Sequence, residues 1–119
     1  MIRGAIDALG QIRVPIELIA ADGAGSTLEA LLDTGFTGSL GMREELARTL
    51  GWRPHGYVEA ALASGSAALN LFLGEVVFDG RRQLVRAVTI TSDDIIVGLS
   101  LLRDKRLLAD FQTGIVTIE

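Results

Sequence analysis

Residues 28–40 read Leu28-Glu29-Ala30-Leu31-Leu32-Asp33-Thr34-Gly35-Phe36-Thr37-Gly38-Ser39-Leu40. The first five are mostly apolar and predict a strand, which ends at a carboxylate that small and turn-forming residues follow at once. A carboxylate beside apolar walls costs free energy unless it is paired, hydrogen-bonded or protonated, and proteins place such groups at working sites more often than elsewhere. Asp33-Thr34-Gly35 can also be a plain turn that closes a strand. The rest of the chain has to decide between these two interpretations.

The composition predicts a mainly β protein. Of the 119 residues, 49% are hydrophobic but only 5% are aromatic, so aliphatic side chains have to fill the core. Gly, Asp or Ser interrupts the apolar runs about every ten residues, which is the spacing of many short strands. The length suits one domain with a hydrophobic core, and we expect that domain to span residues 1–119.

Charge and residue usage disfavour several classes of function. The net charge is −4, and the densest basic cluster is Arg81-Arg82, so we expect no nucleic-acid partner. Cysteine is absent, which excludes disulfide scaffolds and thiolate metal sites. His55 is the only histidine, so a His-containing catalytic triad would need that residue, and a zinc site is disfavoured. We therefore expect neither a cofactor nor a metal.

No apolar stretch in the sequence reaches the length of a membrane span. The first residues include the acidic Asp7, where a signal peptide would be apolar. We therefore expect a soluble, cytoplasmic protein with no membrane partner.

Apolar periodicity and turn residues predict nine strands and two short helices. Pro15 lacks an N–H donor, so the second strand is expected at a sheet edge. The run 95–98 is wholly apolar and is expected to be buried on both faces. The strands are predicted at 4–8, 12–20, 27–32, 57–63, 67–78, 83–91, 95–98, 107–111 and 115–118, with helices at 43–50, ended by Gly51, and 99–106. Tight turns are predicted at Leu9-Gly10, Ser64-Gly65-Ser66, Asp79-Gly80 and Gln112-Thr113-Gly114.

Three segments together resemble the retropepsin-like aspartic proteases of clan AA, and more closely their small prokaryotic single-domain group marked by Asp-Thr-Gly-Phe. The first is the loop 31–40. The second is Ile96-Val97-Gly98-Leu99-Ser100-Leu101-Leu102, and the third is the ending 109–119. The resemblance covers most of the chain and implies a small closed β-barrel-like fold with one or two short helices, working as a two-fold homodimer.

The resemblance also implies roles for individual residues. Asp33 would be the catalytic carboxylate, Thr34 would brace the active-site loop across the two-fold axis, and Gly35 would let substrate lie close to the backbone. Phe36 and a flap tip formed by Ala63, Ser64, Gly65 and Ser66 would contact substrate. Two positions depart from the group: Ser100 stands where many relatives have Asp or Asn, and Ser64 stands where the flap tip often has Asp.

The chemistry of such an enzyme requires a second copy of the chain. Aspartic peptidases use two carboxylates that share one proton, so that one activates a water and the other polarises the scissile carbonyl. The chain has one Asp-Thr-Gly, and Gln112-Thr113-Gly114 cannot replace it because an amide does not titrate. We therefore expect a homodimeric aspartic endopeptidase that cuts peptides beside hydrophobic residues. The last strand, 115–118, and the N-terminal residues are expected to form the dimer interface.

Two other functions remain open on the sequence. A dimer of the same fold could bind peptides or partner proteins without cutting them. A hydrolase could instead hold a metal at Asp33, Asp93 and Asp94, although two adjacent acids are more often a solvated turn. Trp52 could line a substrate groove, but a core position is the simpler interpretation.

Overall fold

The computed structural model describes residues 1–119, apart from the side chain of Leu62. Strands make up most of the chain, as the composition predicts, with one short α-helix, α1 (Glu44–Thr49), and one 3-10 helix, η1 (Leu99–Leu102). The strands are β1 (Ile2–Ile6), β2 (Ile12–Ile19), β3 (Gly25–Leu32), β4 (Leu40–Met42), β5 (Arg53–Leu62), β6 (Gly65–Phe78), β7 (Arg81–Thr89), β8 (Ile95–Val97), β9 (Leu107–Asp110) and β10 (Ile115–Ile118).

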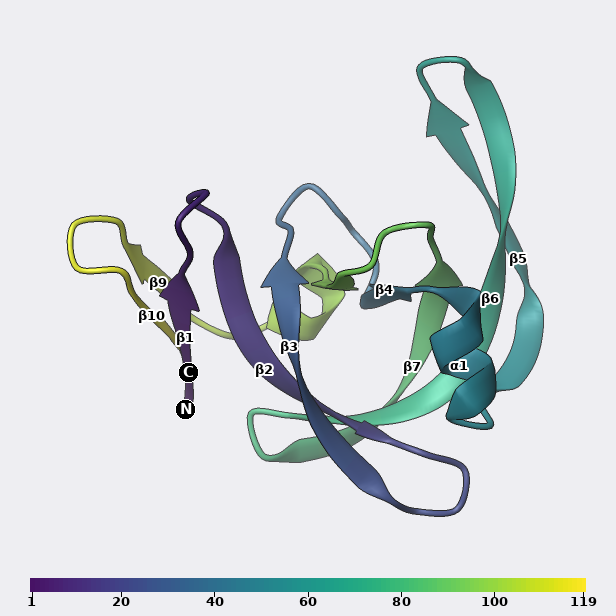
Figure 1. The fold of residues 1–119 in the computed structure, drawn as a ribbon, viewed down its shortest axis with the longest axis horizontal. Coiled ribbons are helices and arrows are strands. Elements are labelled where there is room, and N and C mark those ends of the chain that lie inside the picture. Colours follow the sequence, from purple (N-terminus) through teal and green to yellow (C-terminus); the bar gives the residue numbers. More distant parts are fainter.

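Six of these strands close into a barrel. The sheet runs in the order β5-β6-β7-β4-β8-β3-β2-β1-β10-β9, and β6 also pairs with β2. That extra pairing joins β2, β3, β8, β4, β7 and β6 into a closed ring. On one side of the ring, β5 extends β6 into a long hairpin that projects from the barrel (Figure 1). On the other side, β1, β10 and β9 continue the sheet from β2.

Aliphatic side chains fill the core, as the low aromatic content predicts. Residues from nearly every strand are buried, among them Val14, Ile16, Leu18, Leu40, Met42, Val76, Val97, Val116 and Ile118. Trp52 is also a core residue, with 6% of its surface exposed. Its Nε1 donates a hydrogen bond to the carbonyl of Ile19 at 2.8 Å. A Cβ on Gly74 would lie 2.0 Å from the indole ring, so this glycine makes room for the tryptophan.

The second strand is not an edge strand, so the prediction from Pro15 is wrong. β2 pairs with β3 along its length, with β1 at Ile12 and Arg13, and with β6 from Glu17 to Ile19. Pro15 lies between the pairings with β1 and β6, where one side of β2 has no ladder partner among the described residues. The missing N–H is therefore tolerated at a gap within the sheet, where one neighbouring strand ends and another begins.

Several element ends differ from the predictions. The turn between β5 and β6, where the flap tip is predicted, is Ala63-Ser64, because Leu62 pairs with Gly65, and Gly65 and Ser66 belong to β6. The second predicted helix is a single 3-10 turn that ends at Arg103, whose backbone is extended with ψ 133. Ile96 is half-buried, whereas burial on both faces was expected. Gly51 follows α1 with φ +72, the left-handed conformation expected of a helix-ending glycine.

The last strand has neighbours on both sides. β10 pairs with β1 from Ile115 to Ile118 and with β9 over the same residues, and Val116 and Ile118 are fully buried. β10 therefore has no free edge for the dimer interface predicted at 115–118. Among the helices of the described residues, none is long and apolar enough to cross a membrane.

Candidate active site

Two parallel strands of the barrel place Asp33 at their carboxyl ends. β3 pairs with β8 in the register Ala30↔Ile95, Leu31↔Ile96 and Leu32↔Val97. Directly after β3, the N–H of Asp33 donates to the carbonyl of Val97 at 3.0 Å. The two segments singled out in the sequence, 31–40 and 96–102, therefore meet in space. Asp33-Thr34-Gly35 does form a turn that closes a strand, as the plain-turn interpretation predicts. That turn lies beside the segment 96–102.

The Asp33 side chain is exposed in the single chain. The Oδ1 of Asp33 accepts a hydrogen bond from the N–H of Gly35 at 2.8 Å. The backbone carbonyl of Asp33 accepts one from the N–H of Phe36 at 3.1 Å. A Cβ on Gly35 would lie 3.1 Å from that same Oδ1, so glycine keeps the turn uncrowded. The apolar wall expected around the carboxylate is thus open on one side, where solvent reaches it.

The loop after Asp33 rests on the start of η1. Three successive N–H groups of the segment 98–100 donate to carbonyls of the loop: Gly98 to Ser39 at 3.0 Å, Leu99 to Phe36 at 2.9 Å and Ser100 to Gly38 at 3.2 Å. These bonds join backbone groups only, so they fix the backbone of the loop without any side chain taking part. Its shape is therefore set within one chain.

Gly98 allows the loop to approach the start of η1 closely, and Ser100 adds a side-chain hydrogen bond between them. A Cβ at position 98 would lie 2.2 Å from the carbonyl oxygen of Gly38 and 2.7 Å from that of Phe36, so no side chain fits there. The hydroxyl of Ser100 donates to the carbonyl of Thr37 at 2.8 Å. Ser100, which departs from the Asp or Asn of many relatives, therefore still provides a polar contact to the loop.

A small apolar pocket lies next to the carboxylate. It has a volume of about 250 Å³ and is lined by Asp33, Phe36, Gly41, Ile90 and Ile96. Gly41 belongs to β4 and Ile90 follows β7, so the pocket brings together segments far apart in the sequence. Its lining is mostly apolar, and Asp33 is the one charged residue in it.

Thr34 and the flap tip are placed apart from this pocket. Thr34 is exposed, and its hydroxyl makes no hydrogen bond within the part of the chain that the structure describes. Ala63, Ser64, Gly65 and Ser66 are exposed as well, and none of them lines the pocket. The β5–β6 hairpin that carries them stands away from the loop after β3 (Figure 1). The single chain therefore holds residues 33–36 on one loop, with Asp33 and Phe36 at the pocket, while the four residues of the predicted flap tip lie apart from it.

The acidic pair Asp93-Asp94 is held by arginines. Asp93 forms an ion pair with Arg43, and Asp94 forms one with Arg13 at 2.7 Å. Within the part of the chain that the structure describes, no three His, Cys, Asp or Glu side chains gather closely enough to hold a metal ion. The geometry thus gives no support to a metal shared by Asp33, Asp93 and Asp94.

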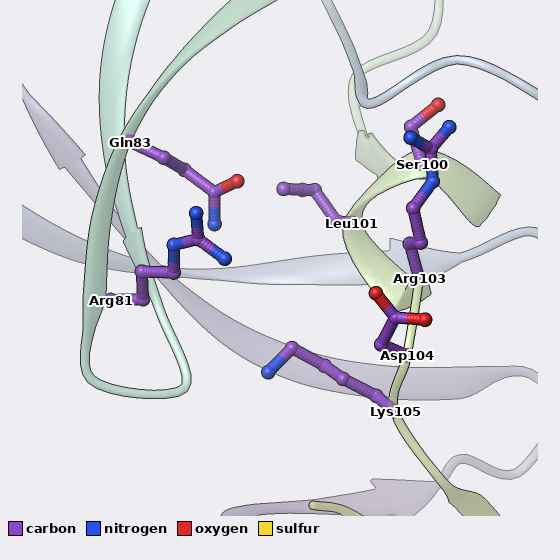
Figure 2. A pocket seen from close by; sticks show the side chains of 7 residues that line it. All are labelled: Arg81, Gln83, Ser100, Leu101, Arg103, Asp104 and Lys105. Atoms are coloured by element: carbon purple, nitrogen blue, oxygen red, sulfur yellow. The ribbon is translucent and has the colours of Figure 1, made fainter.

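A separate polar pocket of about 500 Å³ lies between the start of β7 and the segment after η1 (Figure 2). Arg81 and Gln83 line one side of it, and Arg103, Asp104 and Lys105 line the other. Lys105 is engaged by Asp79 at 3.0 Å. None of the lining residues belongs to the loop 33–39, so this basic pocket is distinct from the one at Asp33.

Comparisons with known proteins bear on the fold. No family model matches the sequence, and no curated protein matches it. The structure is similar to a retropepsin-like aspartic protease from Rickettsia conorii, with a TM-score of 0.65 and 17% identity, over 98% of this chain and 87% of that one. The chain has a retropepsin-like fold. It is also similar to the simian foamy virus (mac) protease, with a TM-score of 0.54 and 18% identity, over 74% of this chain and 90% of that one.

Within this retropepsin-like fold, sequence reasoning missed the residues that complete the pocket. Ile90 and Gly41 carry no local signal, because their place at the pocket arises only when β4 pairs with β7 on one side and with β8 on the other. The sequence shows Ser100 only as a departure from the family pattern. The hydrogen bond from its hydroxyl to the carbonyl of Thr37 arises when η1 packs against the loop after β3. Asp33 and Gly98 were found because each lies in a recognisable local segment.

Proposed function

We propose that two copies of this chain, each contributing residues 1–119 as one protease domain, form an aspartic endopeptidase. The observation that carries the proposal is the placement of Asp33. The carboxylate lies at the end of β3, on a loop fixed by backbone hydrogen bonds, exposed on one side and beside an apolar pocket on the other. The retropepsin-like fold of the chain supports the same function.

The proposed reaction uses Asp33 and the Asp33 of a second copy as a pair that holds one proton. The ionised carboxylate takes a proton from a water molecule, and that water attacks the scissile carbonyl carbon. The protonated carboxyl transfers its proton to the carbonyl oxygen, which becomes a hydroxyl in the tetrahedral intermediate. When that intermediate collapses, the C–N bond breaks and the leaving amine takes the proton that the first carboxylate received from water. One hydroxyl of the intermediate returns its proton to the second carboxylate, which restores the pair with its single proton.

The surrounding residues have supporting roles in this proposal. Gly35 lets the peptide backbone approach, and Thr34, exposed in the single chain, bonds across the two-fold axis. Phe36 and Ile96 form part of the pocket that takes an apolar side chain next to the cut. Ala63, Ser64, Gly65 and Ser66 close over an extended peptide, which the exposed hairpin can bind through its backbone by strand addition.

The test compares wild type with Asp33→Asn on a diverse pool of peptides, from acidic to neutral pH, with mass spectrometry of the products. Asparagine keeps an oxygen that can accept from the N–H of Gly35, so the loop is expected to keep its shape. We expect new peptide ends, flanked by aliphatic or aromatic residues, from the wild type alone. The same products from both proteins would contradict the proposal.

Two further readings of this experiment separate the alternatives. Loss of wild-type cleavage in the presence of a chelator would favour the metal-dependent hydrolase. A wild type that binds peptides and cuts none of them would favour the non-catalytic binding module. The emission of Trp52, the only tryptophan, checks that both proteins are folded, because it is buried in the native state.

A further inference from the structure

The basic pocket of Figure 2 lies outside the site at Asp33 and has a chemistry of its own. Its volume is about 500 Å³, against about 250 Å³ for the apolar pocket, and the two pockets share no lining residue. The cations in its lining are Arg81, Arg103 and Lys105, and the one anion is Asp104. A chain with a net charge of −4 thus has a local excess of positive charge at one cavity.

The alternation of β7 directs two polar side chains into this pocket. Successive side chains of a strand point to opposite faces, so residues 81, 83, 85 and 87 share one face. Val85 and Ala87 are buried in the core. Arg81 and Gln83 continue this inward face beyond the point where the apolar packing ends. They therefore line the pocket from the inner face of β7 and not from its outer face.

No other side chain occupies the polar groups of Arg81 and Gln83. Within the described residues, Arg81 belongs to no ion pair and the amide of Gln83 makes no hydrogen bond, whereas the next residue, Arg82, is held by Glu75 at 2.7 and 2.8 Å. Figure 2 shows Arg81 and Gln83 pointing from β7 across the pocket toward η1. A guanidinium and an amide both carry N–H donors, so this wall offers donors to a ligand oxygen.

The opposite wall of the pocket is a tight turn that carries Arg103, Asp104 and Lys105. The N–H of Lys105 donates to the carbonyl of Leu102 at 3.0 Å. Arg103 has φ −55 and ψ 133, and Asp104 has φ +61. These are the angles of a type II turn, whose third position is normally glycine or asparagine. Asp104 therefore holds its carboxylate at the pocket at a cost in backbone strain.

A second aspartate lies beside the same pocket. In the part of the chain that the structure describes, Asp79 and Asp104 are the non-glycine residues with positive φ. Asp79 holds the Nζ of Lys105 at 3.0 Å, so the charge of Lys105 is already balanced. Arg103 is exposed and, like Arg81, has no ion pair among the residues described. Two arginines thus remain to balance the charge of a ligand.

An oxyanion matches these groups. Carboxylates and phosphates accept several hydrogen bonds at once, and the planar fork of arginine suits both. The carboxylate of Asp104 would repel a bare anion placed against it, but it accepts a hydrogen bond from a hydroxyl. Leu101 also lines the pocket and offers an apolar contact to a short carbon chain. Ser100 contributes less, because its hydroxyl already donates to the carbonyl of Thr37.

We propose that the basic pocket binds a small hydroxylated oxyanion. Its carboxylate or phosphate group lies against Arg81 and Gln83, and its hydroxyl donates to Asp104. Arg103, which is exposed and flexible in length, contacts the anion from the opposite wall. Because the ligand bridges β7 and the turn after η1, it binds the folded chain and not the unfolded one. This site is independent of peptide cleavage at Asp33.

Four probes separate the anionic group from the hydroxyl. Succinate and malate differ by one hydroxyl, and propyl phosphate and glycerol 3-phosphate differ by two. Isothermal titration calorimetry at constant ionic strength measures their dissociation constants for wild type, Arg81→Gln and Arg86→Gln. Arg86 is the matched control, because it is an exposed arginine of β7 on the face opposite to Arg81, and its loss changes the net charge equally.

We expect at least one hydroxylated probe to bind wild type. Its dissociation constant should rise about tenfold or more in Arg81→Gln and stay unchanged in Arg86→Gln. Binding of malate alone assigns a carboxylate, binding of glycerol 3-phosphate alone assigns a phosphate, and binding of both assigns either oxyanion. No binding of any probe, or the same loss of affinity in both variants, overturns the proposal.

Asp104→Gly tests the role of the carboxylate. Glycine adopts positive φ without strain, so the turn is expected to keep its shape, and the unfolding temperature should not fall below that of wild type. Wild type should bind the hydroxylated member of a pair more tightly than its partner, and the variant should bind the two equally. A preference that survives in Asp104→Gly, or one that wild type lacks, contradicts the proposed place of the hydroxyl.

Discussion

The hydroxyl of Ser100 donates a hydrogen bond to the carbonyl of Thr37 at 2.8 Å, and so ties η1 to the loop that carries Asp33. The two residues are 63 positions apart in the chain. Together with the three backbone bonds from 98–100, this contact holds the loop in place within a single chain. The position of Asp33 is therefore set by the start of η1 as much as by β3.

Removing this hydroxyl is expected to loosen the loop. Ser100→Ala should lower the free energy of unfolding by about 0.5–1 kcal/mol, since the bond is solvent-exposed and neutral hydrogen bonds contribute about that much. Urea unfolding followed by Trp52 emission measures the change. Ser100→Thr keeps the hydroxyl and is the matched control. If both variants lose the same stability, the hydroxyl is not what holds the loop.

A side chain at position 98 is expected to be costly. The Cβ of Gly98→Ala would meet backbone carbonyls at 2.2 and 2.7 Å, and backbone cannot move aside without breaking the three bonds to the loop. We expect a loss of about 3 kcal/mol or more in urea unfolding.

The control for position 98 is Gly10→Ala. Gly10 has φ +80 and nothing within 4 Å of the added Cβ, so only backbone strain of about 1–2 kcal/mol is expected. A loss at position 98 no larger than at position 10 would contradict the close contact between η1 and the loop.

Trp52 is expected to stabilise the protein through its indole N–H as well as its packing. Trp52→Phe removes the donor to the carbonyl of Ile19 and leaves that acceptor buried, which costs about 1–3 kcal/mol. Thermal unfolding followed by circular dichroism measures the loss. A variant as stable as wild type would show that the hydrogen bond contributes little.

Acid is expected to weaken the two hairpin turns that follow Asp7 and Asp110. The N–H of Gln11, the Arg13 guanidinium and the N–H of Leu9 hold the pKa of Asp7 below its usual value. The N–H groups of Gln112 and Thr113 do the same for the pKa of Asp110. A carboxyl with a lowered folded pKa contributes stability that is complete above the unfolded pKa, about 3.9, and is lost as the pH falls through the folded value.

The double variant Asp7→Asn with Asp110→Asn isolates this effect, because asparagine keeps an acceptor oxygen but does not titrate. Wild type should be the more stable protein at neutral pH, and its advantage should shrink as the pH falls below about 4. Urea midpoints at a series of pH values give the difference. An advantage that stays constant in acid would show that these carboxyls are not the source.

Much of the fold could be predicted because its signals are local. Apolar patterns and turn residues located every strand except the short β4, and Asp79-Gly80 marked a tight turn in which both residues have positive φ, +52 and +73. The edge position predicted from Pro15 is wrong because the place of a strand in a sheet depends on which distant strands pair with it. A gap in the pairing tolerates the missing N–H of a proline as well as a sheet edge does. The turn between β5 and β6 lies one residue earlier than predicted, because Gly65, with φ +129, begins a strand.

The candidate site could be predicted only in part. Asp33 and Gly98 lie in short segments with a recognisable pattern, and the structure brings these segments together. The exposure of Asp33 and the contributions of Ile90 and Gly41 to its pocket depend on how four strands assemble, which no local pattern encodes. The interface predicted at 115–118 stays a prediction, and because β1 and β9 occupy both edges of β10 it would have to use side chains rather than strand pairing.

The most direct test of the central claim mixes wild type with Asp33→Asn at a fixed wild-type concentration and measures peptide cleavage after subunit exchange. If each site needs Asp33 from two chains, mixed dimers are inactive. An equal amount of the variant should then lower the rate to about half, because half of the wild-type chains are paired with it. A rate that does not change on addition of the variant would show that one chain carries the whole site, and would contradict the account.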